Sequence, residues 1–339
     1  MSLGVVIALL GSSCTKSSPS VSPADSAGTS GQPLVSNLKD NYSFSLFYYA
    51  LKKTGLDRGI SGTGSYTLLV PDNDAFARDS ILGDSDVDKL DTAYLRQWMA
   101  YHILPGVITT ASVAQTINNA YPSITGQTLY FSKPVPTQNE TNSAINKVLH
   151  INGDTVNTID QLASNGVIQV LNRPLKLPQS SIQAYLSAQP RYSYFVSALQ
   201  HFGLWDELTG KGPFTIWAPD DSAFISNGIS LDSLNKIDTV HFQEQFMGIY
   251  VLTPARVFLT DFTDAPPTTA PSFYGGYLFF PNNGPYFYLP QSNGPGNFAD
   301  YIGFDDYLVA QWVDPDVIAG NGVVQGINGL LILPSQATK

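Results

Sequence analysis

The chain has 339 residues, of which 43% are apolar and only 13% are charged. This length favours about two domains, and the apolar fraction lets each bury a core. The net charge of −10 is uneven, because the part after residue 180 holds 14 acidic residues against 5 basic ones. Affinity for nucleic acid comes largely from neutralising phosphates, so this composition argues against a nucleic-acid partner.

Residues 1–14 predict a targeting signal. The apolar run over residues 3–10 is too short to span a bilayer but suits the core of a signal peptide. Small residues then lead into Cys14, which resembles a bacterial lipoprotein signal and predicts cleavage with lipid attachment to this thiol. An incidental or buried thiol is the alternative interpretation. Because Cys14 is the single cysteine, no intrachain disulfide can form.

Residues 15–33 consist mostly of Ser, Pro, Gly, Thr and Ala. Such a segment has too few apolar side chains to offset the entropy of ordering, so we expect a flexible tether. After a lipid anchor, a tether would lift the folded part clear of the membrane surface.

The first folded unit begins with a predicted helix. Between residues 38 and 56, apolar side chains recur at three- and four-residue spacing, which favours a helix with a broad buried face. A β-prone run over residues 66–70 is then stopped by Pro71, which has no backbone donor. Asp72 or Asn73 is the expected N-cap of the short helix that follows.

Residues 84–88, with the sequence Asp-Ser-Asp-Val-Asp, look like the opening of a calcium-binding loop. A loop of that type needs glycine at its sixth position and glutamate at its twelfth, and this sequence has neither. We therefore interpret these acids as the beginning of helical structure. Asp88 or Asp91 is expected to stabilise the positive end of a helix over residues 92–101.

That helix leads into Tyr-His-Ile-Leu-Pro-Gly at residues 101–106, where Pro-Gly forces a turn. Residues 128–172 alternate Gly, Asn and Asp turns with β-prone runs, which predicts hairpins. The unit closes with an Asn-Gly turn at residues 165–166, a strand through Leu171, and Leu-Pro at residues 177–178.

The second half of the chain repeats these landmarks. Residues 214–224 repeat residues 66–76, and Pro219 lies 148 residues after Pro71. Recurrence of several landmarks in the same order indicates a tandem duplication of one domain. The others are an opening helix within residues 181–208, a helix from about Asp238 to Tyr250, a strand over residues 322–327 and a closing Leu-Pro at residues 333–334.

The motif order itself resembles the fasciclin domain family. Val/Ala-Pro-Asp-x-x-Ala-Phe comes first, then Tyr-His-Ile-Leu-Pro-Gly, then Asn-Gly-Val-Ile before Leu-Pro, and the resemblance covers about residues 34–334 in two copies. It implies an α+β fold: two tandem fasciclin-like domains at residues 34–178 and 181–334, each a wedge-like, twisted β-sandwich with several short helices. It also implies an extracellular or surface-attached adhesion module without catalytic activity and without a cofactor.

The Tyr-His motif of this family has been linked with partner binding, which makes Tyr101, His102 and Leu104 candidate partner-binding residues. The structural alternative is that His102, at a helix end beside Pro-Gly, hydrogen-bonds a turn carbonyl and holds the corner. The second copy has Tyr250 at the position of the histidine and Thr253-Pro254 in place of Pro-Gly. Because that copy manages without the histidine, the structural role is favoured.

Catalytic and metal-binding motifs are missing from the sequence. The chain has four histidines, and none stands in a His-x-x-x-His or Cys/His arrangement that would predict a zinc site. It also lacks a Gly-x-Ser-x-Gly elbow and a phosphate-binding glycine loop. The adjacent acids Asp220 and Asp221 have a capping role to fill. A glycosidase pair contributed by distant residues stays open, but we expect no enzyme, no metal and no cofactor.

Residues 275–307 hold ten aromatic side chains among Asn, Gly and Pro. Ordinary hairpin strands with half of the rings in the core would explain this composition. The sharper hypothesis is an exposed surface of rings and amides that stacks on sugars or grips a protein, with Tyr286 and Tyr288 as candidate binding residues.

Together these features predict a non-catalytic adhesion or binding protein of a bacterial cell envelope. It would be lipid-anchored to the outer membrane, surface-exposed, and bind a surface or matrix protein or a polysaccharide. The alternative is a glycan-binding accessory lipoprotein of an outer-membrane carbohydrate uptake system. A sugar site would need two or three coplanar exposed rings in one cleft, whereas an adhesive surface would be broad.

Overall fold

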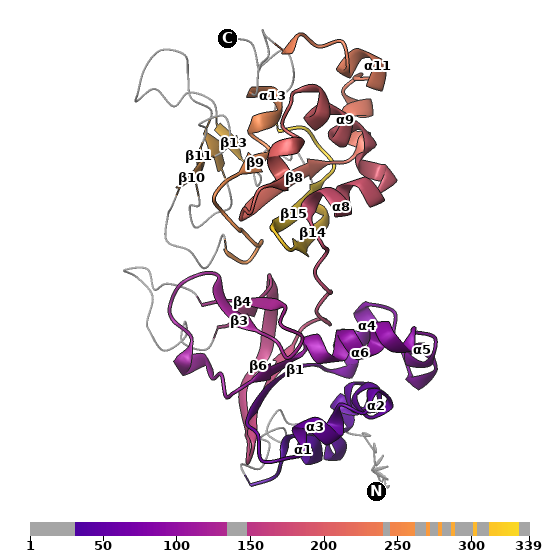
Figure 1. The fold of residues 1–339 in the computed structure, drawn as a ribbon, viewed down its shortest axis with the longest axis vertical. Coiled ribbons are helices and arrows are strands. Elements are labelled where there is room, and N and C mark those ends of the chain that lie inside the picture. The colour runs from indigo at the N-terminus through magenta and orange to yellow at the C-terminus, as the bar shows by residue number, and fades with distance from the viewer. Residues whose placement is uncertain are drawn as a thin grey trace, which may run out of the picture.

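The computed structural model describes residues 31–133, 148–239, 245–261, 269–271, 277–279, 286–288, 301–303 and 312–331. Within them the chain forms two α+β domains joined by a short linker (Figure 1). The predicted signal with Cys14, most of the predicted tether and much of the aromatic segment lie outside the described residues. Among the described helices, none is long and apolar enough to cross a membrane.

In the first domain the helix expected over residues 38–56 is divided. Asn41 has an extended backbone, and its side chain accepts a hydrogen bond from the Ser43 nitrogen, so the chain leaves one helix and starts another. The helices are α1 (Leu34–Asp40), η1 (Tyr42–Phe44), α2 (Ser45–Thr54), α3 (Asp57–Ile60), α4 (Asn73–Arg78), α5 (Asp84–Asp88), α6 (Thr92–Tyr101) and η2 (Thr110–Ser112).

The expected strand, proline and helix cap are confirmed in both copies. Asp72 accepts a hydrogen bond from the Ala75 nitrogen at 2.8 Å and begins α4. Asp220 does the same for Ala223 at 3.1 Å in the second domain. Asp91 caps α6, which spans the predicted residues. Local capping chemistry therefore sets where these helices begin.

One continuous sheet of seven strands forms the rest of the first domain, in the order β2-β1-β7-β6-β5-β4-β3. Its first and last long strands, β1 and β7, are parallel neighbours, and all other pairs are antiparallel. The strands are β1 (Tyr66–Pro71), β2 (Ile103–Pro105), β3 (Asn119–Pro122), β4 (Thr128–Ser132), β5 (His150–Ile151), β6 (Asp154–Ala163) and β7 (Gly166–Leu171).

Side chains along β1 point alternately to the two faces of the sheet, and the interior of the domain is therefore divided into two cores. Leu68 and Val70 join the core beneath the helices, with Phe47. Leu69, which points the other way, joins a second core that includes Phe131 on β4. The helices accordingly cover one side of β1 and β7, and strands β3 and β4 lie on the other (Figure 1). The sheet is therefore arranged like a β-sandwich, with one core between its strands and a second core between β1, β7 and the helices.

The second domain repeats this plan around a sheet of order β14-β15-β8-β9, in which β8 and β15 are parallel. Strands β10 to β13 pair as a separate antiparallel sheet. Its helices are α8 (Ile182–Ala188), η3 (Pro190–Tyr192), α9 (Ser193–His201), η4 (Asp206–Thr209), α10 (Asp221–Ser226), α11 (Leu231–Leu234) and α13 (Gln245–Gly248). Its strands are β8 (Phe214–Pro219), β9 (Val251–Leu252), β10 (Thr269–Pro271), β11 (Tyr277–Phe279), β12 (Tyr286–Tyr288), β13 (Tyr301–Gly303), β14 (Trp312–Ala319) and β15 (Gly322–Ile327).

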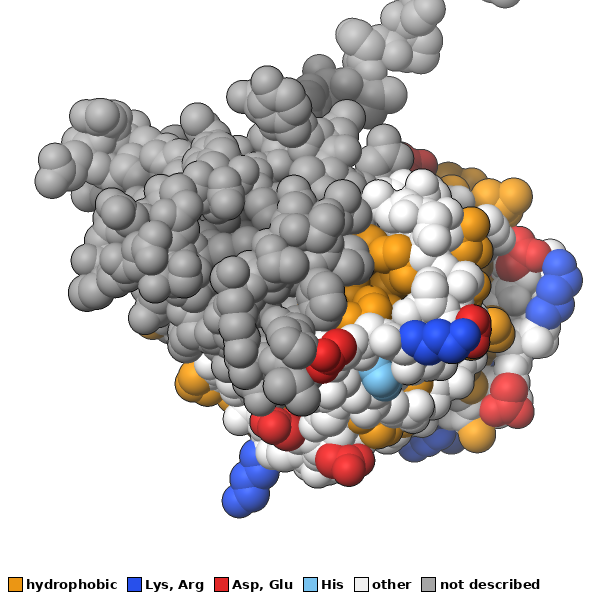
Figure 2. Space-filling view, turned by 90° about the horizontal axis from the view of Figure 1, so that it is seen from above, with side chains coloured by type: hydrophobic (Ala, Val, Ile, Leu, Met, Phe, Trp, Pro, Cys, Tyr) orange, Lys and Arg blue, Asp and Glu red, His pale blue; other side chains and the backbone are white. Residues whose placement is uncertain are grey.

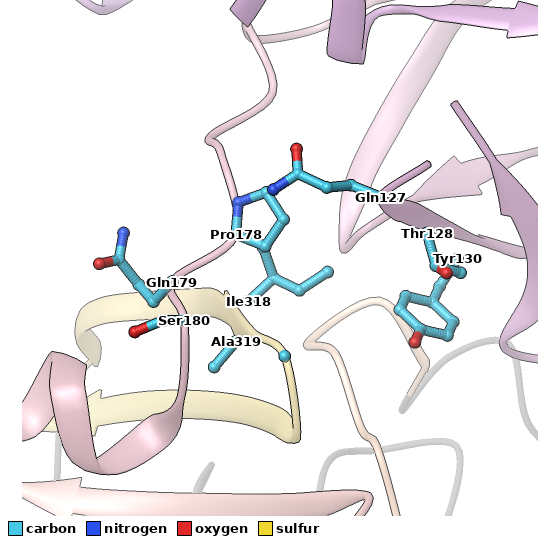
Figure 3. A pocket seen from close by; sticks show the side chains of 9 residues that line it. Gln127, Thr128, Tyr130, Pro178, Gln179, Ser180, Ile318 and Ala319 are labelled. Atoms are coloured by element: carbon cyan, nitrogen blue, oxygen red, sulfur yellow. The ribbon is translucent and has the colours of Figure 1, made fainter. Parts of the chain in front are cut away.

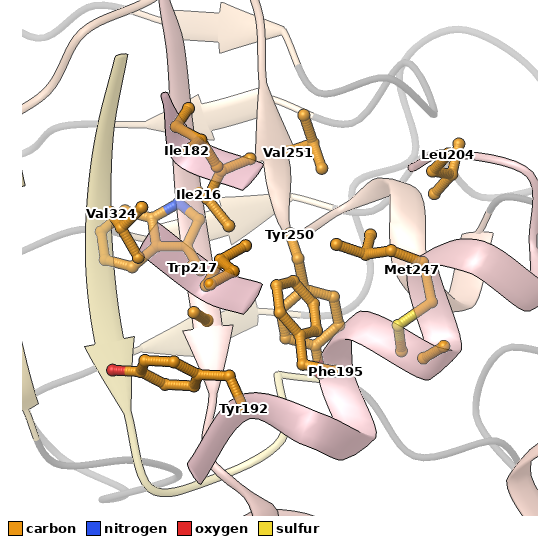
Figure 4. Close-up of a cluster of buried hydrophobic side chains, with 14 of the residues drawn as sticks. Ile182, Tyr192, Phe195, Leu204, Ile216, Trp217, Met247, Tyr250, Val251 and Val324 are labelled. Carbon is orange, nitrogen blue, oxygen red and sulfur yellow. The ribbon is translucent and has the colours of Figure 1, made fainter. Parts of the chain in front are cut away.

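One large cluster of buried side chains makes up most of the core of the second domain. Figure 4 shows Tyr250 beside Phe195 of α9, and their ring centroids are 5.8 Å apart. Trp217 and Ile216 of β8 extend the same cluster, and all four side chains are buried. Aromatic rings therefore tie the helical layer to the sheet.

Each copy also buries the same polar network. In the first domain the Gln169 side chain donates to the Ile108 oxygen at 3.1 Å and to Asp160 at 2.7 Å. In the second, Gln325 donates to the Val257 oxygen at 2.9 Å and to Asp316 at 2.7 Å. Both aspartates have a left-handed backbone, with φ of 56° and 57°, at an irregularity in strand pairing. The glutamine thus fixes a bulge in each sheet.

Candidate functional site

The candidate residues of the Tyr-His motif lie inside the first domain. Tyr101, His102 and Leu104 are all buried, and His102 is only 1% exposed. The His102 Nδ1 lies 2.8 Å from the Trp98 oxygen, and Nε2 accepts a hydrogen bond from the Leu175 nitrogen at 3.0 Å. Nδ1 therefore carries the proton. Burial lowers the pKa of His102 to about 4, so the ring is neutral near pH 7.

Tyr250 occupies the corresponding position in the second domain. Its hydroxyl accepts a hydrogen bond from the Leu331 nitrogen at 2.8 Å. In both copies, therefore, this side chain holds the segment that follows the last strand against the end of a helix. His102 thus has a structural role, but its partners are the Trp98 oxygen within the helix and the Leu175 nitrogen rather than the turn carbonyl that the sequence predicted.

Tyr101 secures another part of the first domain. Its hydroxyl accepts a hydrogen bond from the Asn152 side chain at 2.9 Å and donates to the Thr128 oxygen at 3.3 Å. These bonds tie the turn between β5 and β6 to β4. Burial raises the pKa of Tyr101 far above its usual value, so the hydroxyl keeps its proton.

The exposed part of this corner is the turn itself, where Gly106 and Val107 lie at the surface. A partner that approached the motif would meet these residues before the buried rings. Contact between a partner and Tyr101, His102 or Leu104 stays a prediction.

The second pair of candidates, Tyr286 and Tyr288, forms the two ends of β12. Tyr288 is paired directly with Tyr277 on β11 and with Tyr301 on β13. The backbone register thus places three tyrosines at opposite positions on adjacent strands. Their role in binding sugars also stays a prediction.

Sequence reasoning did not anticipate the interface between the domains. The guanidinium of Arg256 lies 3.9 Å from the centre of the Tyr130 ring, a cation–π contact between the second domain and the first. Phe258 packs near the same ring, with centroids 6.3 Å apart. The Asn118 side chain also donates to the Arg256 oxygen at 2.6 Å. Aromatic and polar contacts together bind the two domains.

Acidic side chains add to this interface. The fully buried Asp261 accepts a hydrogen bond from the Ser132 hydroxyl at 2.6 Å. Asp316, from the bulge of the second sheet, lies so close to Gly153 that a Cβ atom there would be 2.5 Å from its Oδ2. Burial, with Asp261 and Asp154 nearby, raises the pKa of Asp316 to about 7. The interface thus contains a carboxyl group that titrates near neutral pH.

The linker is also held in place. Gln179 pairs with β14, donating to the Ile318 oxygen at 2.9 Å and accepting from the Gly320 nitrogen at 2.9 Å. Beside it is a crevice of about 330 Å³, where Tyr130 lies across from Ile318 and Ala319 (Figure 3). These bonds fix Gln179 to the second domain, so the part of the linker that is free to bend is shorter.

A second crevice of about 290 Å³ lies on the acidic side of the interface. Asp154 accepts a hydrogen bond from the Arg173 nitrogen at 2.8 Å, and burial raises the pKa of Asp154 to about 6. Arg173, Lys176 and Asp316 also line this crevice. Among the described residues no group of three or more His, Cys, Asp or Glu side chains is placed to hold a metal ion.

A groove of about 730 Å³ lies on the helical side of the first domain, between η1 and α2 on one edge and α4 and α5 on the other. Sequence reasoning missed it, because its residues are far apart along the chain. A position-by-position comparison of the two sequence copies could have indicated these residues. Its apolar lining consists of Tyr42, Leu46, Tyr48, Tyr49, Ala77 and Leu82.

Comparison with known proteins identifies the domain. The model of the fasciclin domain matches residues 42–178 and 190–334. The chain belongs to the fasciclin domain family. Both fasciclin copies contain the parallel strand pair and the buried glutamine described above.

Relatives occur in bacteria and animals. A fasciclin relative in Synechocystis sp., protein sll1483, is 31% identical over 170 residues, which are 48% of this chain and 83% of that protein. Human periostin is 26% identical over 167 residues, which are 49% of this chain and 18% of periostin. A solved FAS1 domain pair from the insect cell adhesion molecule Fasciclin I is 18% identical, with a TM-score of 0.36, over 88% of this chain and all of that one.

Proposed function

We propose that this chain is a non-catalytic adhesion or binding protein of a bacterial cell envelope. A lipid on Cys14 would anchor it to the outer membrane, the tether would carry the domains away from the bilayer, and the domains would bind a surface protein or a polysaccharide. The observation that supports the proposal most is the pair of fasciclin domains itself.

The placement of polar groups is consistent with a binding role. The buried histidine, tyrosines and glutamines are engaged in hydrogen bonds that hold turns and strands. On the face shown in Figure 2, charged side chains are scattered among uncharged ones rather than gathered in one patch. Non-obligate interfaces have much the same composition as the rest of a protein surface, so a mixed face of this kind fits that class of contact.

Anchoring and binding can be tested separately with the full chain. Metabolic labelling with a palmitate analogue should mark the wild-type protein and not a Cys14→Ala variant, and protease added to intact cells should cleave the surface-exposed protein. Wild-type protein should also bind immobilised envelope or matrix proteins in a saturable way. If the wild-type protein is not labelled, the proposed lipid anchor is rejected. If it shows no saturable binding to any protein or glycan surface, the proposed binding function is rejected.

The second candidate function is glycan capture for a carbohydrate uptake system. The register that pairs Tyr277, Tyr288 and Tyr301 on adjacent strands favours it, because sugar recognition uses aromatic platforms. A glycan array probed with the full chain should then show binding to a defined polysaccharide that Tyr288→Ala removes. Binding that survives Tyr286→Ala and Tyr288→Ala would reject this candidate site.

A further inference from the structure

The groove on the helical side of the first domain exposes more apolar surface than its fold needs. Tyr42 is 86% exposed and Leu82 is 75% exposed at opposite edges of the groove, and Tyr48 and Tyr49 line the space between them. Exposed apolar side chains that line a concave region are a common feature of interaction sites.

The second domain shows which groove residues the fold requires. The two copies keep a constant offset of 148 residues here, since α2 corresponds to α9 and α4 to α10. Even the tertiary contact is repeated: Asn73 accepts a hydrogen bond from the Leu46 nitrogen, and Asp221 accepts one from Tyr194. Yet the positions of Tyr42, Tyr49 and Leu82 are occupied by Pro190, Ser197 and Ser230 in the second copy. Tyr42 and Leu82, the most exposed apolar residues of the groove, therefore have no large apolar counterpart in the second domain. Tyr49 differs from them, because it also packs against the core of the first domain.

The exposed side chains stand on a fixed backbone. The Tyr42 oxygen accepts a hydrogen bond from the Asn73 side chain at 2.9 Å. The Leu82 nitrogen donates to the Asp86 carboxylate at 2.9 Å, and the Tyr49 hydroxyl donates to Asp88 at 2.8 Å. Since these positions are already ordered, a ligand would bind them at a small cost in conformational entropy.

The charges of the groove select the chemistry of its occupant. Lys52, its one lining cation, is already paired with Asp57 at 2.8 Å. Asp74 and Asp84 also line the groove and have no hydrogen-bond or ion-pair partner among the described side chains. The groove thus offers two unpaired carboxylates beside tyrosine rings, and both attract a guanidinium or ammonium group.

We infer that this groove binds a segment of a partner protein that presents arginine or lysine next to an apolar side chain. The cation would lie between a tyrosine ring and Asp74 or Asp84, and the apolar side chain would pack on Leu82. The inference rests on the proposed binding function and adds the site and the class of partner. An acidic polysaccharide would be repelled by the same carboxylates and by the net charge of −10.

The test is a selection of phage-displayed random dodecapeptides on the immobilised full chain. A second selection uses the Tyr42→Ala/Leu82→Ser variant, and a third uses Ile225→Ser, which removes an exposed apolar residue from the second domain. We expect the wild type and Ile225→Ser to enrich peptides with Arg or Lys beside Leu, Ile or an aromatic residue. The groove variant should bind the enriched peptides at least tenfold more weakly, as should Asp74→Ser/Asp84→Asn, with unchanged melting temperatures.

Equal enrichment on the wild type and the groove variant would overturn the inference, as would enriched peptides that are acidic or uncharged. A neutral oligosaccharide whose binding is lost with Tyr42→Ala would assign the groove to glycans instead. Rejection of the inferred groove site can be told apart from rejection of the proposed binding function. In the first case the chain still binds an envelope or matrix surface regardless of the groove variants, whereas in the second it binds none.

Discussion

His102 and Tyr250 accept equivalent hydrogen bonds in the two domains, although one is an imidazole and the other a phenol. The donors are the backbone nitrogens of Leu175 and Leu331, at 3.0 Å and 2.8 Å. At this position the two copies thus share a buried hydrogen-bond acceptor that faces the segment after the last strand. A residue that differs between repeats can still do the same structural work.

Tyr250→Phe should destabilise the second domain. The change leaves the Leu331 nitrogen buried without its acceptor, which costs about 1–3 kcal/mol of unfolding free energy. Denaturant unfolding should show a lower midpoint with little change in the denaturant dependence. Tyr42→Phe, at an exposed position, is the matched control and should leave the midpoint unchanged.

His102 should make the first domain sensitive to acid. Its pKa falls from 6.5 to about 4 in the folded state, so between these values the unfolded chain takes up a proton that the folded chain does not. The stability that the neutral His102 ring contributes is therefore fully present above pH 6.5. It is lost as the pH falls toward 4, by up to about 3 kcal/mol. Unfolding measured at pH 7 and pH 4.5 should show a smaller loss in His102→Gln, which has no titrating ring. An equal loss in both proteins would contradict this account.

Asp316 should have the opposite pH dependence. The folded state raises its pKa from 3.8 to about 7, so the stability that its protonated form contributes is fully present below pH 3.8 and is lost as the pH rises from there through 7. Asp316→Asn can still accept from the Leu259 nitrogen and Gln325 but carries no charge. We expect the variant to melt at a higher temperature than the wild type at pH 8, and the difference should be smaller at pH 5, where part of the stabilisation is still present. Asp232→Asn, an exposed site, controls for the loss of one negative charge.

Gly153→Ala should disturb the interface between the domains. At this position φ is +82°, and an added Cβ would lie 2.5 Å from the Asp316 carboxylate. Gly126→Ala is a matched control, because φ there is +81° and no atom lies within 4 Å of the added Cβ. Both variants should lose about 1–2 kcal/mol from backbone strain, and Gly153→Ala should lose more. Small-angle scattering should show a changed domain arrangement in Gly153→Ala only.

Elements that depend on neighbouring residues were predictable from the sequence. The capped helices after Pro71 and Pro219, the closing strands and the duplication all rest on local chemistry or repetition. The helix expected over residues 38–56 was predicted as one piece because its apolar spacing is continuous. The capping side chain of Asn41 interrupts it, and periodicity does not detect such a break.

Long-range contacts were not predictable in the same way. The sequence placed strands at residues 66–70 and 166–171 but could not show that they are parallel neighbours, since pairing depends on the whole sheet. It assigned His102 a structural role without identifying Leu175 as its partner. Nor does any local pattern place Tyr130 beneath Arg256, because that contact forms only when two separate domains dock.

The parallel pairing of β1 with β7, and of β8 with β15, has a mechanical consequence. The chain enters each domain ahead of the first of these strands and leaves after the second. Tension between the ends therefore pulls two neighbouring strands in opposite directions along their length. The ladder bonds from the pair Tyr66 and Gly166 to the pair Pro71 and Leu171 then resist together rather than opening one after another. Pulled at its two ends, the chain would oppose extension at two shear-loaded strand pairs in series.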